Sequence, residues 1–146
     1  HATTSYFAPT WKKFAVAAAV AGVISPIASL IAGPRRGLAY TAGLVSTYIG
    51  YEVFHRRAHV TAPTNRIDRW LYKHHFYHHF HKPSVNHGVT SPLWDIVFGT
   101  YEEPDVIRVP VRHAMPWLID PETGTLDSRF VSDYCIVDKR KPKVAA

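Results

Sequence analysis

A run of 19 residues without a charged side chain constrains this 146-residue chain more than any other feature. It extends over residues 14–32 and reads FAVAAAVAGVISPIASLIA. As an α-helix the run would be about 28 Å long, close to the thickness of the hydrocarbon core of a bilayer. Pro26 lies inside the run and predicts a kink, because neighbouring helices can satisfy the carbonyl that it frees. The run therefore predicts a transmembrane helix.

A second apolar run, residues 37–54, follows a segment typical of a tight turn, Gly33–Gly37. Its single charged side chain is Glu52, near the far end. The two runs together predict a transmembrane helical hairpin over residues 1–54, with both ends on the same side of the membrane. The alternative is a helical hairpin buried in a soluble protein, but the length of the uncharged run favours the membrane.

Positive charge is concentrated at the open end of this hairpin. The chain has 17 Lys and Arg against 11 Asp and Glu, a net charge of +6, and the turn holds only Arg35 and Arg36. Positively charged flanks stay on the cytoplasmic side, so the open end and the chain beyond it are expected to face the cytoplasm. This bias accounts for most of the net charge and argues against nucleic acid as a partner. The residues concerned are Lys12, Lys13, Arg56, Arg57, Arg66, Arg69, Lys73 and Lys82.

The remaining chain has two further parts. Residues 55–104 contain most of the histidines, and residues 105–146 are expected to form a soluble, irregular cap with a basic tail. Four prolines interrupt the cap, although residues 106–111 and 130–137 favour β-structure. The predicted fold is thus an all-α membrane protein: a helical hairpin, a helical histidine region and a cap.

Eight of the ten histidines fall between His55 and His87, and their spacing predicts a metal site. His55 and His59 are four apart, so on a helix they share one face. His75, His78 and His79 repeat this at spacings of three and four within residues 66–80, which contain no helix breaker. Imidazoles on two such helices can enclose metal ions, and imidazole suits Fe, Zn, Cu and Ni.

Other interpretations of the histidines are a solvated interfacial patch or a tract that chelates metal without purpose. The conjunction of both spacings directly after a membrane hairpin favours a functional metal site. A zinc finger built on cysteines is excluded, because Cys135 is the only cysteine.

The two histidine motifs and the following segment NHGVTSPLWDIVFGT resemble the C-terminal half of the fatty acid hydroxylase/sterol desaturase superfamily. Members of this superfamily are membrane-bound, non-haem di-iron oxygenases. The resemblance is close over residues 51–101 and implies two iron ions, for which zinc can substitute in a purified form. The ligands that it implies are His55, His59, His75, His78 and His79.

The superfamily has further histidine motifs before the hairpin, and this chain lacks them. His1 lies where the last histidine of such a motif would fall, which makes it a further candidate ligand. We therefore expect the chain to be the C-terminal part of a longer enzyme. The alternative is a half-protein that dimerises to complete the site.

Three residues are candidates for supporting the ligands. Glu52 is three positions before His55 and could accept the imidazole N–H that faces away from a metal, or it is an ordinary interfacial charge. Asp95 could cap a helix or orient a ligand. His87 stands where the superfamily often has Phe, which makes it an additional supporting group or a tolerated replacement.

The resemblance implies O2-dependent hydroxylation or desaturation of a lipid such as a fatty acyl chain, ceramide, sterol or carotenoid. Such a reaction needs two electrons from a donor such as cytochrome b5 or a ferredoxin. A different class of function is a non-enzymatic metal-binding or bis-histidine haem protein of the membrane. A third is a basic module that binds anionic lipid headgroups.

Overall fold

The computed structural model describes residues 8–138, and these form two compact units with a boundary between Phe54 and His55. The first unit contains helix α1, Thr10–Ala32, and most of helix α2, Pro34–Val60. The second contains the last turns of α2, helix α3 (Arg66–Phe80), helix α4 (Leu93–Val97) and strands β1 (Ile107–Pro110) and β2 (Tyr134–Val137). The described residues are mostly helical, as the sequence predicts.

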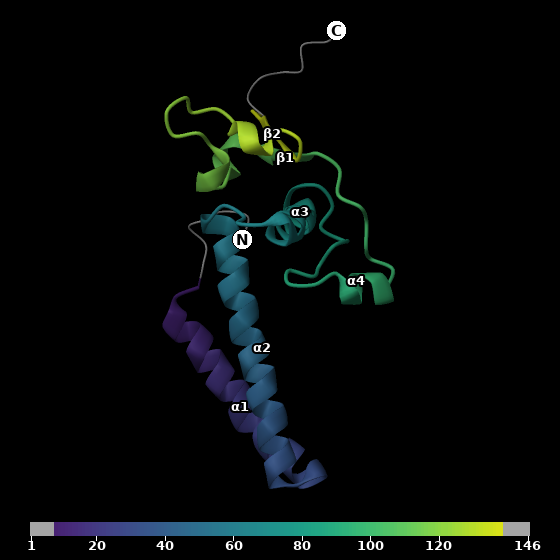
Figure 1. Cartoon of the computed structure of the whole chain (residues 1–146). Coiled ribbons are helices and arrows are strands. Elements are labelled where there is room, and N and C mark those ends of the chain that lie inside the picture. Colours follow the sequence, from purple (N-terminus) through teal and green to yellow (C-terminus); the bar gives the residue numbers. More distant parts are fainter. Residues whose placement is uncertain (1–7, 139–146) are drawn as a thin grey trace. The chain divides into compact units, whose positions relative to one another are not determined.

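Helices α1 and α2 run side by side and are joined by Gly33 alone (Figure 1). Gly33 has a φ of 84°, which favours glycine, and Pro34 occupies the first position of α2, where its missing N–H removes no helical hydrogen bond. The predicted turn over residues 33–37 is therefore too long: after Gly33 its residues form the first turn of α2. The Cβ of an alanine at position 37 would lie 2.4 Å from the backbone N of Ser29, so the two helices meet closely there.

The outer surface of α1 is apolar and uncovered. Leu30 is 87% exposed and Ile31 is 81% exposed, and Ala17 is the one buried residue of this helix. Among the described helices, only α1 is both long and apolar enough to cross a membrane. Its exposed side chains require an apolar cover such as lipid. The second span of the predicted hairpin is not confirmed by this criterion.

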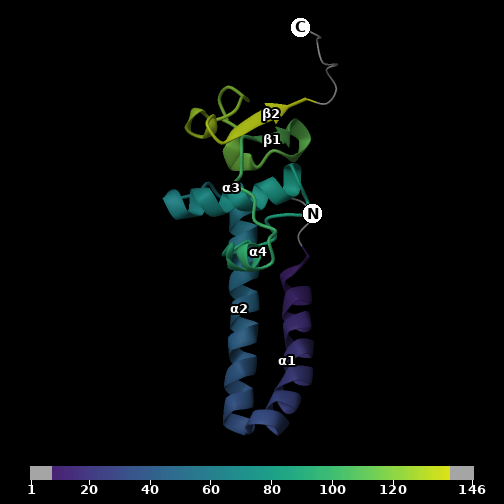
Figure 2. The ribbon, with the colours of Figure 1, turned by 90° about the vertical axis from the view of Figure 1, so that its right-hand side faces the viewer.

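The second unit is built around α3, which lies across the last turns of α2 (Figure 2). Asn65 caps its N-terminus, since the side-chain oxygen of Asn65 accepts a hydrogen bond from the backbone N–H of Asp68 at 2.8 Å. Tyr72 and Phe76 are fully buried beneath the cap. The indole N–H of Trp117 donates to the carbonyl of Ala58 at 2.9 Å, which ties the cap to α2.

The cap contains a two-stranded parallel sheet in which Ile107 pairs with Tyr134. Ile107 and Val109 are fully buried while Arg108 between them is exposed, the period-two pattern of a strand. Three short 3₁₀ segments connect the strands: Val111–His113, Pro116–Leu118 and Ser128–Phe130. An all-α description is therefore wrong for the cap, because its β-branched segments form a sheet.

Candidate metal centre

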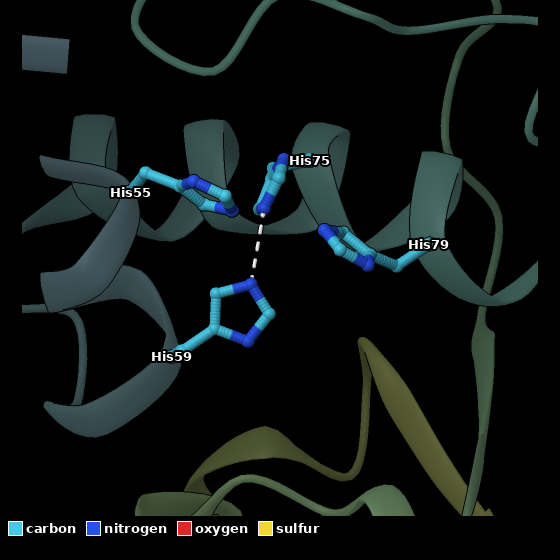
Figure 3. Close-up of side chains that lie close together, drawn as sticks. All are labelled: His55, His59, His75 and His79. Carbon is cyan, nitrogen blue, oxygen red and sulfur yellow. Dashed lines mark hydrogen bonds between the residues drawn. The ribbon is translucent and has the colours of Figure 1, made fainter. Parts of the chain in front are cut away.

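Four imidazoles from two helices converge in the second unit. His55 and His59 project from the last turns of α2, and His75 and His79 project from α3 (Figure 3). In each pair the residues are four apart, which places them on one helix face. One ring nitrogen from each of the four residues lies within 4.8 Å of the others. The four-residue spacing of the histidines along each helix and the crossing of α2 and α3 together produce this cluster.

The separation of the ring nitrogens suits a shared metal ion. The Nε2 atoms of His59 and His75 are 3.3 Å apart. Two nitrogens bound tetrahedrally to one ion, each about 2.0–2.1 Å from it, lie about 3.3–3.4 Å from each other. The ring centroids of His55 and His75 are 4.7 Å apart, and those of His59 and His79 are 4.9 Å apart. The donor set consists of imidazoles alone, as suits iron, zinc, copper or nickel.

Burial keeps three of these imidazoles, His59, His75 and His79, in the neutral form that binds metal. His55, His59 and His75 are buried and His79 is partly buried. Burial, with a smaller contribution from His55, lowers the pKa of His59 to about 4. Burial and the neighbouring His59 lower the pKa of His79 to about 3, and burial also lowers the pKa of His75 well below its usual value. At neutral pH these three imidazoles can therefore bind a metal without first losing a proton.

His78 lies on α3 but outside this group of four. Its Nδ1 donates a hydrogen bond to the backbone carbonyl of Val85 at 2.9 Å. Its ring centroid is 4.9 Å from that of His87 and 5.8 Å from that of His79. The structure thus brings together four of the five imidazoles implied by the sequence resemblance and places the fifth beside His87. His1, the sixth candidate ligand, lies outside the described residues.

Asp95 is a buried anchor for the loop that follows α3. Its carboxylate accepts hydrogen bonds from the backbone N–H groups of His87 and Gly88, both at 2.8 Å, and from the Thr100 hydroxyl at 2.8 Å. Its Oδ2 is also 3.0 Å from Nε2 of His74. Burial alone would raise the pKa of Asp95, but these hydrogen bonds outweigh it and hold the pKa below its usual value. Asp95 therefore fixes the backbone at His87 instead of touching the four-histidine cluster.

Sequence reasoning gives His74 no definite role: it predicts a residue on the surface or one that supports the ligands. Its spacing does not fit the ligand pattern, yet its side chain is fully buried. The ring stacks between Trp70 and Tyr101, with centroid distances of 5.8 and 5.7 Å, and contacts Asp95. The available signal is Asp95 itself, since a carboxylate within an apolar segment needs hydrogen-bond donors when it is buried.

Glu52, the third proposed supporting residue, forms an ion pair with Lys13 of α1. Both residues belong to the first unit, and both side chains are partly buried. This contact joins the two helices at the end opposite Gly33. The structure thus places Glu52 as an ion-pair partner of Lys13.

Comparison with known proteins identifies the family of this chain. A family profile described as fatty acid hydroxylase matches residues 1–100, and the chain belongs to that family. Dihydroceramide fatty acyl 2-hydroxylase FAH1 of Arabidopsis thaliana is 40% identical over 74 residues, which cover 51% of this chain and 31% of the relative. Dihydroceramide fatty acyl 2-hydroxylase FAH2 of the same plant is 37% identical over 71 residues, 49% of this chain and 30% of the relative.

The chain spans about a third of the length of these curated relatives. No solved structure shows a significant match to this chain. The family match over residues 1–100 includes both histidine motifs.

Proposed function

We propose that this chain forms part of a membrane-bound di-iron enzyme that hydroxylates the fatty acyl chain of a lipid of the ceramide class. The observation that carries the proposal is the cluster of four imidazoles within 4.8 Å in a chain of the fatty acid hydroxylase family. The names of both Arabidopsis thaliana relatives support the lipid class.

Two iron ions, once bound, would supply the activation of O2 and the replacement of a C–H bond by C–OH. The balanced reaction takes up O2, two electrons and two protons, and yields the hydroxylated lipid and water. The electrons require a separate donor, for which cytochrome b5 and a ferredoxin are candidates. The residues that would hold the ions are the clustered His55, His59, His75 and His79, together with His78, which the sequence resemblance implies. Zinc could occupy the same imidazoles after purification.

Five imidazoles are few ligands for two metal ions, so further ligands are proposed to come from a preceding part of the same protein or from a dimer partner. The polypeptide's own part is to hold neutral imidazoles in a fixed arrangement and to limit the access of water. The buried, aromatic surroundings of Phe76 and Tyr72 serve both purposes. The apolar helix α1 would anchor the protein in the bilayer, where the lipid is dissolved, with the histidines on the cytoplasmic side.

A haem protein is disfavoured by the same geometry. A porphyrin is a flat macrocycle that needs its two axial imidazoles on opposite faces, with space between them. The four rings here have centroid separations as small as 4.4 Å and contact one another edge to face. No gap for a macrocycle remains among them.

The proposal is tested on the purified membrane protein by metal analysis together with an assay of acyl hydroxylation in reconstituted lipid. We expect iron without a Soret band, and loss of both iron and activity in His75→Ala. His81→Ala is the matched control, because His81 is exposed at the end of α3 and stacks on Tyr77. A Soret band, or full activity in His75→Ala, would contradict the proposal.

A further inference from the structure

We propose that His87 is a metal ligand, and that it forms with His78 a second imidazole subsite next to the four-histidine cluster. The inference rests on the proposed function for the identity of the metal, but its geometry is independent of it. The ligand class is a transition ion that accepts imidazole, such as iron, zinc or cobalt.

The first step is the ring nitrogen of His78 that remains available. Nδ1 of His78 faces the carbonyl oxygen of Val85 at 2.9 Å, so this nitrogen must carry the proton. In the neutral ring, the nitrogen with the lone pair is consequently Nε2. Metal-bound histidines have this arrangement, in which the second ring nitrogen donates to a backbone carbonyl or a carboxylate.

The second step is the distance between the two rings. The centroids of His78 and His87 are 4.9 Å apart. Two imidazoles that bind one ion at about 2.0–2.1 Å, with an angle at the ion between about 90° and 109°, have centroids about 4.6–5.3 Å apart. The observed separation also falls among those within the four-histidine cluster, which range from 4.4 to 6.1 Å.

The third step is that the loop holds His87 in a built frame, although its side chain is exposed. Asn86 adopts a φ of 54°, and its side chain is buried, with hydrogen bonds in both directions to the backbone of Glu102 at 2.8 and 2.9 Å. The backbone N–H of His87 itself is held by Asp95 at 2.8 Å. Gly88 admits no side chain, because a Cβ there would lie 2.0 Å from the carbonyl oxygen of Ser91.

The same loop therefore performs two tasks. Its residue Val85 orients His78, and two residues later it supplies a second imidazole beside that ring. A Phe at this position would preserve the packing surface of the loop and remove the nitrogen. His87 would thus add one nitrogen ligand beside His78, outside the group of four.

The test compares His87→Phe with His81→Phe in the intact membrane protein. Both replace an exposed histidine in the same region by the same residue. The number of bound metal ions is measured by elemental analysis, and the affinity for Co2+ is measured by competition with a chelator. We expect His87→Phe to lower the affinity for the second ion by at least about tenfold, because loss of even an outer-shell partner of a metal ligand lowers metal affinity by that much. His81→Phe is expected to match the wild type.

His75→Ala separates this inference from the proposed function. If His75→Ala loses metal while His87→Phe keeps the wild-type number of bound ions and the wild-type affinity, the proposed subsite is refuted and the proposed function stands. If the wild-type protein binds no transition metal, both are overturned. Equal thermal unfolding of His87→Phe and wild type, measured alongside, shows that a loss of metal comes from the missing nitrogen.

Discussion

At the scale of single residues, the buried imidazoles predict a stability that depends on pH. In the unfolded chain a histidine takes up a proton below a pH of about 6.5, whereas folded His59 does so only near its pKa of about 4. Between these values the unfolded state binds more protons, so the free energy of unfolding of the metal-free protein falls as the pH is lowered from about 6.5 to about 4. Urea unfolding at a series of pH values measures this slope. His59→Gln is expected to reduce it, and an unchanged slope would contradict the burial of this imidazole.

Asp95 carries the second prediction at this scale. In Asp95→Asn an amide nitrogen replaces an oxygen that accepts hydrogen bonds, so at least one buried donor among His74, His87, Gly88 and Thr100 loses its partner. The expected loss in the free energy of unfolding is about 1–3 kcal/mol. Glu122→Gln, at an exposed position, is the control and is expected to change little. Chemical unfolding of the two variants gives the comparison, and equal stabilities would show that Asp95 is not an anchor.

At the scale of elements, the sequence predicts those contacts of the site that depend on helical periodicity alone. The spacing of His55 from His59 and of His75 from His79 is sufficient to place each pair on one face. That His78 turns instead toward Val85, and that His74 meets Asp95, depends on the path of the loop after α3, which has no periodic signal. The early start of α2 has a local cause, since proline fits the first position of a helix. The sheet of the cap depends on tertiary structure, because a short alternating segment becomes a strand only when a partner strand lies beside it.

The close approach of α1 and α2 gives a prediction for this pair of helices. In Gly37→Ala the new Cβ would collide with the backbone of Ser29, which cannot move aside as a flexible side chain would. The helices must separate, at a cost of about 1–3 kcal/mol typical of overpacking. Gly43→Ala is the matched control, since no atom lies within 4 Å of a Cβ at that position. We expect a lower melting temperature in detergent for Gly37→Ala alone, and a similar melting temperature for both variants would contradict the close contact.

At the scale of the whole molecule, the four-histidine cluster packs against a cap whose described residues, up to Asp138, supply none of its four imidazoles. The two helices that carry the four imidazoles are held by Trp117, whose indole N–H binds the carbonyl of Ala58 on α2. The same ring contacts Tyr72 and Phe76 on α3, with centroid distances of 6.0 and 6.1 Å. One side chain of the cap therefore connects both ligand-bearing helices. We therefore expect metal affinity to depend on the folding of the cap.

Replacing Trp117 tests this coupling. Trp117→Phe keeps an aromatic ring against α3 but removes the hydrogen bond to Ala58, so the last turn of α2 loses its attachment and metal affinity should fall. Trp117→Ala also opens a cavity and should cost about 3–5 kcal/mol of stability. Trp94→Phe is the control, because Trp94 is 63% exposed on α4. Chelator competition measures the metal affinity of the three variants, and chemical unfolding measures their stability. Trp117→Phe should bind metal more weakly than Trp94→Phe, because only Trp117→Phe loosens the helix that carries His55 and His59. Equal metal affinities would mean that α2 and α3 hold their imidazoles without the cap.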